Sequence, residues 1–448
     1  MRTLEALASA LAAGQTTSRL LVEECLARIA DPAGEGGRIF LRVYAAESRA
    51  MADAADAQRR ANRAPSRYAG IPISLKDLCD VAGEVTAAGS RVLADATPAT
   101  TTAPVVQRLL AAGFIPMGRT NMTEFAFSGL GINPHFGTPR SPWGRRSDGG
   151  RIPGGSSAGA AVSVADQMAF GALGTDTGGS CRVPAAMCGI VGYKPTARRV
   201  PIDGILPLSP SLDSVGPLAN SVACCATLDA VMAGEVPRPI DPLPLTGLRL
   251  GVPLNIVLDQ LDQVVGETFQ RVLAKLVEMG AMILPGPFPA LDEIGPANAR
   301  GGFAAAEGFA WHRKLVEARG EHYDPRIRQR ILRGESQSAA DYIDLLHSRA
   351  AIIRRMDAHT AQFDALVMPT CPIIPPTIAE LDDETAYNRA NMLLLRNTTI
   401  GNFLDRCAIS LPVQAAGMPP VGLMLMGETM GDRKLFAIAA AVEAALAV

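Results

Sequence analysis

Residues 153–185 read PGGSSAGAAVSVADQMAFGALGTDTGGSCRVPA and contain two Gly-Gly-Ser clusters. The first serines of the two clusters, Ser156 and Ser180, are 24 positions apart. Glycines allow backbone conformations that other residues avoid, and successive backbone N–H groups in such loops can bind an anion. The pattern therefore predicts a site in which main-chain groups and two serines approach a ligand closely.

A lysine upstream of these clusters supplies the third polar group that a two-serine site needs. Lys76 follows the apolar run GIPISL at residues 70–75. A serine hydroxyl is a weak nucleophile until a base takes its proton, and lysine can be that base when desolvation keeps it neutral. The combination indicates a serine hydrolase with a lysine base. The alternative is a surface lysine paired with Asp77.

The tract GTDTGGS at residues 174–180 places several backbone N–H groups directly before Ser180. Donors in that position can stabilise the oxyanion of a tetrahedral acyl intermediate. For the tract taken alone, a phosphate-binding loop and a simple glycine-rich turn are the alternatives.

Two other residues compete for the role of nucleophile. Residues 155–159 read GSSAG, which matches the GxSxG nucleophile elbow with Ser157 at its centre. An elbow enzyme also needs a downstream histidine in a loop, whereas His312, His322 and His347 stand in charged, helix-like contexts. Cys181 adjoins Ser180, but no histidine is near it in sequence, so a buried structural cysteine is expected.

Composition indicates a globular protein and gives no sign of a membrane or nucleic-acid-binding protein. The 448 residues carry 42 basic and 44 acidic side chains, a net charge of −2, with no long block of one sign. The first residues resemble a helix of the mature protein rather than a signal peptide. We therefore expect a cytoplasmic protein with no membrane partner and no direct nucleic-acid partner.

Cysteine and histidine usage argues against a metal site. The eight cysteines have no CxxC spacing and the five histidines form no HxH or HExxH motif. We expect reduced cysteines in the core and no metal.

Two parts of the chain show the order strand, helix, strand. The first comprises residues 71–75, 105–110 and 114–117, and the second comprises residues 248–252, 265–276 and 281–284. Such alternation predicts a mainly parallel sheet covered by helices. Further helices are expected over residues 21–29 and 46–64, the latter stopped by Pro65, and the proline-rich residues 234–246 form a linker or crossing loop.

At this point the chain resembles the amidase signature family. Motifs in the N-terminal half carry most of the resemblance. Residues 368–370, 409–412 and 420–423 also match the family's C-terminal pattern, so the resemblance extends over most of the chain. In chain order, the N-terminal motifs are GIPISLKD (70–77), RTNMTEF (119–125), RIPGGSSAG (151–159), GTDTGGSCRVPA (174–185), GIVGYKPT (189–196) and DSVGP (213–217).

The resemblance implies an α/β fold with a large mixed, mostly parallel central sheet and helices on both faces. It implies a single domain over residues 1–448, with N-terminal helices at 1–64 and a signature core at 66–225. A helical region at 290–365 would build the substrate pocket, and its sequence matches no pattern that names a substrate.

The resemblance also implies roles for individual residues. Ser180 would be the nucleophile, Ser156 the bridging serine after a cis peptide bond, and Lys76 the base. Lys76 would draw a proton through Ser156 while Ser180 attacks the amide carbonyl, and water would then hydrolyse the acyl-serine without any cofactor. The oxyanion would bind to the backbone of Thr177, Gly178, Gly179 and Ser180.

Several neighbouring residues admit two interpretations. Arg182 can bind a substrate carboxylate or, as we favour, buttress the loop through Asp176. Four residues in and just after the second motif, Asn121, Glu124, Phe125 and Phe127, either line the acyl pocket or pack beneath it.

The function expected from the resemblance is a stand-alone amidohydrolase. It would cleave a linear carboxamide or ureide-like C–N bond in a small-molecule substrate and release ammonia or an amine. The alternative is the glutaminase component of a tRNA-dependent amidotransferase, its A subunit, in which a partner would hold the tRNA. A binding protein without chemistry is a third possibility, and the choice between monomer and homodimer stays open.

Overall fold

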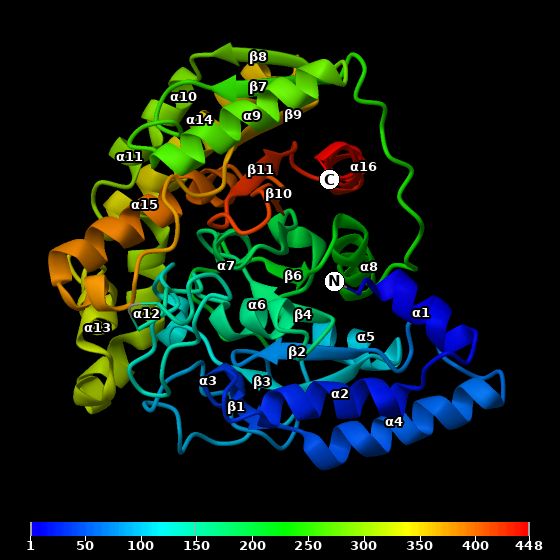
Figure 1. Ribbon diagram of the computed structural model, residues 1–448. Coiled ribbons are helices and arrows are strands. Elements are labelled where there is room, and N and C mark those ends of the chain that lie inside the picture. The colour runs from blue at the N-terminus through cyan, green and yellow to red at the C-terminus, as the bar shows by residue number, and fades with distance from the viewer. Residues whose placement is uncertain (1, 148, 447–448) are drawn as a thin grey trace.

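A computed structural model describes residues 2–147 and 149–446 and confirms the α/β fold (Figure 1). One sheet of 11 strands runs in the order β1-β3-β2-β4-β6-β5-β10-β11-β9-β7-β8. The strands are β1 (Phe40–Val43), β2 (Pro72–Lys76), β3 (Ile115–Thr120), β4 (Gly171–Thr175), β5 (Val191–Lys194), β6 (Val215–Ala219), β7 (Arg249–Pro253), β8 (Met282–Gly286), β9 (Ala365–Pro369), β10 (Ala408–Pro412) and β11 (Gly422–Met426).

Helices surround this sheet. They are α1 (Leu4–Ala12), α2 (Ser18–Ala30), α3 (Gly36–Ile39), α4 (Ala45–Arg60), α5 (Pro104–Ala111), α6 (Ala158–Ala165), α7 (Arg182–Cys188), α8 (Val222–Ala233), α9 (Gln263–Glu278), α10 (Pro289–Asp292), α11 (Ile294–Ala297), α12 (Gly302–Arg319), α13 (Pro325–Leu332), α14 (Ala339–Thr360), α15 (Glu384–Phe403) and α16 (Asp432–Leu446). None of the described helices is long and apolar enough to cross a membrane.

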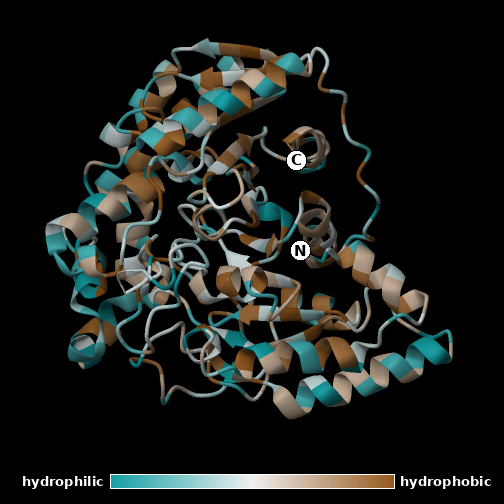
Figure 2. Cartoon of the chain, viewed as in Figure 1, coloured by the Kyte–Doolittle hydropathy of each residue, from teal (hydrophilic) through white to brown (hydrophobic). Residues whose placement is uncertain are grey.

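Both expected strand–helix–strand units are confirmed. The strands β2 and β3 pair in parallel around α5, and β7 and β8 pair in parallel around α9. The helix α9 buries Val265, Phe269, Val272 and Leu276, and teal and brown residues alternate along it in Figure 2. This one-sided apolar pattern explains why a helix forms there and packs on the sheet.

The sheet is mixed, but parallel pairing does not predominate as expected. Four pairs are parallel, β2/β3, β2/β4, β7/β8 and β7/β9, and the other six are antiparallel. The middle strands β5 and β6, like β10 and β11, follow each other without an intervening α-helix. Such connections reverse the strand direction, whereas parallel neighbours need a crossover.

The helix predicted over 46–64 ends at Arg60 rather than at Pro65, because Asn62 has a φ of 54°, in the left-handed region that stops a right-handed helix. The proline-rich residues 234–246 connect α8 to β7 without helix or strand, as predicted, and form the long connection along one side in Figure 1.

Two adjacent parallel strands bring the site together. Leu75 of β2 is paired with Leu173 of β4, so the carboxyl ends of these strands lie side by side. Lys76 is the last residue of β2, and the second Gly-Gly-Ser loop follows β4 and leads into α7. Ligand sites of α/β sheets commonly form at this kind of edge.

Candidate active site

Lys76 and Ser156 are in direct contact inside the protein. The Nζ atom of Lys76 lies 2.8 Å from Ser156 Oγ and 2.8 Å from Thr175 Oγ1. Lys76 and Ser156 are both fully buried. The peptide bond between Gly155 and Ser156 is cis, as the resemblance implied.

The surroundings of Lys76 favour its neutral form. Burial lowers the pKa of Lys76 from 10.5 to about 8, against smaller opposing effects of nearby thiols and carboxyls. A neutral amine can donate an N–H to Thr175 and accept the proton of Ser156 with its lone pair. The geometry and the lowered pKa together fit a general base.

Ser180 faces a cavity, and its backbone contacts the first Gly-Gly-Ser cluster. Its carbonyl accepts a hydrogen bond of 3.3 Å from the backbone N–H of Ser157, which ties the two Gly-Gly-Ser clusters together. Ser180 lines a cavity of about 390 Å³ together with Thr177 and Gly178. Ser180 is therefore placed to meet a ligand, and its carbonyl is hydrogen-bonded to the residue that follows Ser156.

The loop before Ser180 presents unpaired backbone donors. The N–H groups of Thr177, Gly178 and Ser180 have no acceptor within residues 2–147 and 149–446. The N–H of Gly179 instead donates to Asp176 Oδ1 at 2.8 Å. The N–H of Gly179 is therefore not free to bind an oxyanion. Within the described part of the chain, the N–H groups of Thr177, Gly178 and Ser180 are free to do so.

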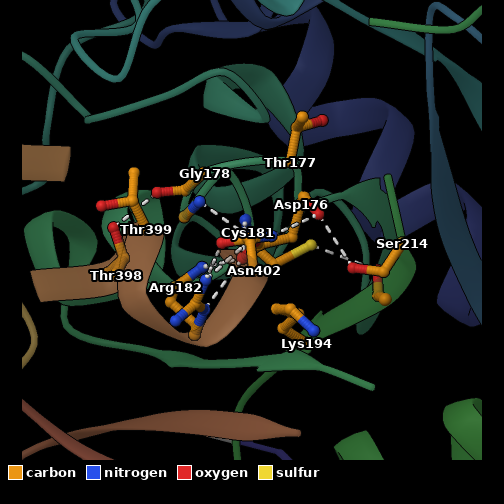
Figure 3. Close-up of polar contacts among 12 residues, drawn as sticks. Asp176, Thr177, Gly178, Cys181, Arg182, Lys194, Ser214, Thr398, Thr399 and Asn402 are labelled. Atoms are coloured by element: carbon orange, nitrogen blue, oxygen red, sulfur yellow. Dashed lines mark hydrogen bonds and ion pairs between the residues drawn. The ribbon is translucent and has the colours of Figure 1, made fainter. Parts of the chain in front are cut away.

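Arg182 stabilises the loop through Asp176, the interpretation favoured from the sequence. It is fully buried, and its Nε and Nη2 atoms donate to the Asp176 carboxylate at 3.0 and 2.9 Å. Burial acts to raise the pKa of Asp176, but Arg182, together with Lys194 and Asn402, outweighs that effect and the pKa falls to about 2. The charged pair holds the loop from inside, as Figure 3 shows.

The competing nucleophiles are poorly placed. The hydroxyl of Ser157 is buried and donates to the carbonyl of Thr175 at 3.2 Å. No strand immediately precedes Ser157, as an elbow would require. Burial raises the pKa of the Cys181 thiol far above its ordinary value, and all eight cysteines are free and buried.

Lys194 is a second buried lysine near the loop, but it serves another purpose. Its Nζ atom donates to the backbone carbonyls of Pro195 and Arg406, at 2.8 Å each. Burial lowers the pKa of Lys194 to about 8 as well. Contact with a serine hydroxyl, rather than burial, therefore separates Lys76 from Lys194.

Of the four residues in and just after the second motif that could line the acyl pocket, one reaches the cavity. Phe127 lines it, whereas Phe125 packs against His312 and Tyr323. The Nδ2 atom of Asn121 donates to the carbonyls of Arg38 and Gly137, and Glu124 accepts from the hydroxyl of Ser90. Asn121, Glu124 and Phe125 are packing residues.

The cavity is lined by apolar side chains and neutral polar ones. Its apolar residues include Phe127, Leu208, Leu212, Ile294, Phe303, Leu395 and Phe403, and none of its described lining side chains is charged. The polar ones other than Ser180 already donate to protein acceptors. These bonds run from Ser128 to Asn391, Thr177 to Asp213, Asn298 to Ile294, Thr399 to Arg396 and Asn402 to Asp176.

Sequence reasoning missed three residues that contact the site. Thr175 holds Lys76, and its place at the end of the strand beside β2 was a usable signal. Thr398 and Asn402 contact the loop from α15, more than 200 positions away. No local pattern could have identified these two.

The chain is similar in sequence and in structure to known proteins. Residues 21–436 match the family model described as Amidase. A 2-amino-5-chloromuconic acid deaminase of Comamonas testosteroni is 40% identical over 84% of this chain and 81% of that protein. The A subunit of the glutamyl-tRNA(Gln) amidotransferase of Chloroflexus aggregans is 34% identical over 97% of this chain and 94% of that protein. A crystal structure of an amidase superposes with a TM-score of 0.89 at 31% identity and covers both chains completely.

Proposed function

This chain belongs to the amidase family and is an amidohydrolase, and we propose that its substrate is a neutral carboxamide with an apolar acyl group. We further propose that Ser180, Ser156 and Lys76 carry out the reaction. The observation that supports these assignments is the contact of a buried lysine with Ser156, together with a second serine, Ser180, that opens onto an apolar cavity and is hydrogen-bonded to the neighbour of Ser156.

The proposed reaction is acyl transfer through Ser180. Its Oγ attacks the amide carbonyl carbon, and its proton passes through Ser156 to the neutral amine of Lys76. The tetrahedral intermediate collapses when the C–N bond breaks, and the proton returns through Ser156 to the departing ammonia or amine. Water then attacks the acyl-serine by the same proton path, which releases the carboxylic acid and restores Ser180.

Charge develops on the carbonyl oxygen during both steps. The backbone N–H groups of Thr177, Gly178 and Ser180 are the proposed donors, since that of Gly179 already binds Asp176. Fixed donors of this kind typically contribute about 10²–10³-fold each to kcat.

The cavity lining supports an apolar acyl group. A buried carboxylate or ammonium needs a charged or hydrogen-bonding partner, and an unpaired one is costly. The described lining residues offer no charged side chain, and apart from Ser180 their polar side chains already donate to protein acceptors. An acidic substrate such as the one that names the 40% identical relative would lack a counter-charge here.

Ammonia release from a panel of primary amides tests the proposal. The panel comprises aryl and branched aliphatic amides, succinamic acid as an anionic amide, and glutamine. We expect the neutral apolar amides to give the highest kcat/KM and the Ser180→Ala variant to release no ammonia from any of them. Faster hydrolysis of succinamic acid than of every neutral amide would contradict the proposed substrate class.

A glutaminase that works within an amidotransferase is the second candidate, because the 34% identical amidotransferase proteins span nearly the whole chain. The same panel discriminates between the two functions. Ammonia release from glutamine alone, or inertness until a partner and aminoacyl-tRNA are added, would favour the amidotransferase component.

A further inference from the structure

The last turns of α15 hold the loop that precedes Ser180. The Oγ1 atom of Thr398 donates to the carbonyl of Gly178 at 2.6 Å. The Nδ2 atom of Asn402 donates to the carbonyl of Asp176 at 3.0 Å and to its carboxylate at 2.9 Å. Residues four apart share one face of a helix, and Figure 3 shows both side chains directed at the loop.

These bonds fix the direction of the backbone donors. In a trans peptide the C=O and the following N–H point to opposite sides. The carbonyl of Asp176 is held by Asn402 and also by Ser214 Oγ at 2.8 Å, so the N–H of Thr177 must point away from them. The carbonyl of Gly179 accepts from the Val183 N–H at 2.7 Å, which turns the Ser180 N–H the other way.

The middle peptide of the loop is held at both ends. Thr398 binds the carbonyl of Gly178, and the Asp176 carboxylate binds the N–H of Gly179. Two adjacent glycines would otherwise allow this peptide to rotate, because glycine populates many backbone conformations. Rotation would carry the flanking N–H groups of Gly178 and Ser180 out of place.

The side chains of Thr398 and Asn402 are not available to the substrate. Thr398 is fully buried and does not line the cavity. Asn402 borders the cavity, but its amide is occupied by Asp176 and its Oδ1 atom accepts from Arg182 at 2.8 Å. Both therefore act on the loop and not on reacting atoms.

We infer that Thr398 and Asn402 are positioning residues that align the oxyanion-binding N–H groups of Thr177, Gly178 and Ser180. The inference rests on the proposed function, since it gives those groups their role. The same helix lines the cavity through Leu395, Thr399 and Phe403, so it fixes the acyl pocket and the oxyanion-binding loop relative to each other.

The test removes the hydroxyl of Thr398 without changing its shape. In Thr398→Val we expect kcat to fall about 10- to 100-fold, less than the typical loss of a whole oxyanion donor. A trifluoromethyl ketone analogue of the best amide, which forms a tetrahedral adduct on Ser180, should bind more weakly by a similar factor. Binding of the amide itself, measured in a Ser180→Ala background, should stay within twofold.

Further variants separate positioning from general destabilisation. Thr398→Ser keeps the hydroxyl and should restore kcat to within about threefold, while Thr398→Ala should behave like Thr398→Val. Thr268→Val, at a buried threonine of α9, is the matched control and should leave all three measurements unchanged.

Activity and ketone affinity of the Thr398 variants decide whether the inference holds. Near-normal kcat and ketone affinity in Thr398→Val, or equal losses of ketone and amide affinity, would overturn the inference. If the wild-type protein hydrolyses no amide of the panel, the proposed function itself fails. A wild type that is active through Ser180, with unaltered Thr398 variants, refutes only the positioning role.

Discussion

The Nζ atom of Lys76 lies 2.8 Å from Ser156 Oγ, and water reaches neither side chain. Without water, the ammonium form of Lys76 loses hydration that Thr175 and Ser156 only partly replace. This is why burial lowers the pKa of Lys76 to about 8. A base that is neutral just above physiological pH is suited to take the proton of a serine relay.

The first prediction concerns the pH dependence of hydrolysis. Because only the neutral amine accepts a proton, kcat/KM should rise with pH, reach half its limit near pH 8 and level off above that value. Lys76→Ala should lose about 10²–10⁴-fold in kcat, the usual contribution of a general base. Rates between pH 5.5 and 10 provide the measurement. A half-maximum near pH 6.5, typical of histidine, would contradict the assignment.

Thr175 provides the second prediction. Its hydroxyl accepts from Lys76 and stabilises the ammonium form, so Thr175→Val should shift the acid limb of the profile to lower pH. Loss of one hydrogen bond corresponds to a shift of roughly one pH unit or less. The limiting kcat should also fall, because the amine is less firmly positioned. Thr175→Ser keeps the hydroxyl and serves as control, and an unmoved limb in Thr175→Val would refute the contact's role.

The third prediction concerns Gly179. Its φ is +134°, and a Cβ atom there would lie 2.2 Å from Thr398 Oγ1. Gly179→Ala should therefore displace the loop and abolish measurable hydrolysis, with the far-ultraviolet circular dichroism spectrum unchanged. Gly266→Ala is the matched control, since that glycine lies within α9 with open space around it. It should keep full activity and gain up to about 1 kcal/mol of stability. An active Gly179→Ala enzyme would show that the loop geometry is not critical.

The fourth prediction concerns Arg182 and the stability of the fold. Removing one partner of a buried ion pair typically costs about 3–5 kcal/mol, because the other charge is left unpaired. Arg182→Met should lower the urea midpoint of unfolding strongly, since Asp176 is fully buried. A variant of unchanged stability with a raised KM would mean that Arg182 binds substrate instead.

The proposed catalytic residues could be identified from sequence because their determinants are local. Ser156 and Ser180 stand in short glycine-rich motifs, and Lys76 ends a strand whose apolar run is visible in the sequence. The two strand–helix–strand units were predictable for the same reason, since their hydrophobic periodicity is contained in each segment.

Features set by distant contacts could not be predicted. The side chains of Thr398 and Asn402 contact the loop from α15, more than 200 positions along the chain. The antiparallel middle of the sheet depends on which strands become neighbours, and β5 and β10 are separated by more than 200 residues. The N–H of Gly179 is unavailable to an oxyanion because it donates to Asp176 Oδ1, and spacing does not encode the orientation of that carboxylate.

The central claim is that Ser180 is the nucleophile and Ser156 its relay. Labelling with a fluorophosphonate followed by peptide mass spectrometry tests it most directly. We predict a single adduct on Ser180, absent from Ser180→Ala and formed much more slowly in Ser156→Ala and Lys76→Ala. An adduct on Ser156, Ser157 or Cys181, or a label that persists in Ser180→Ala, would contradict the claim.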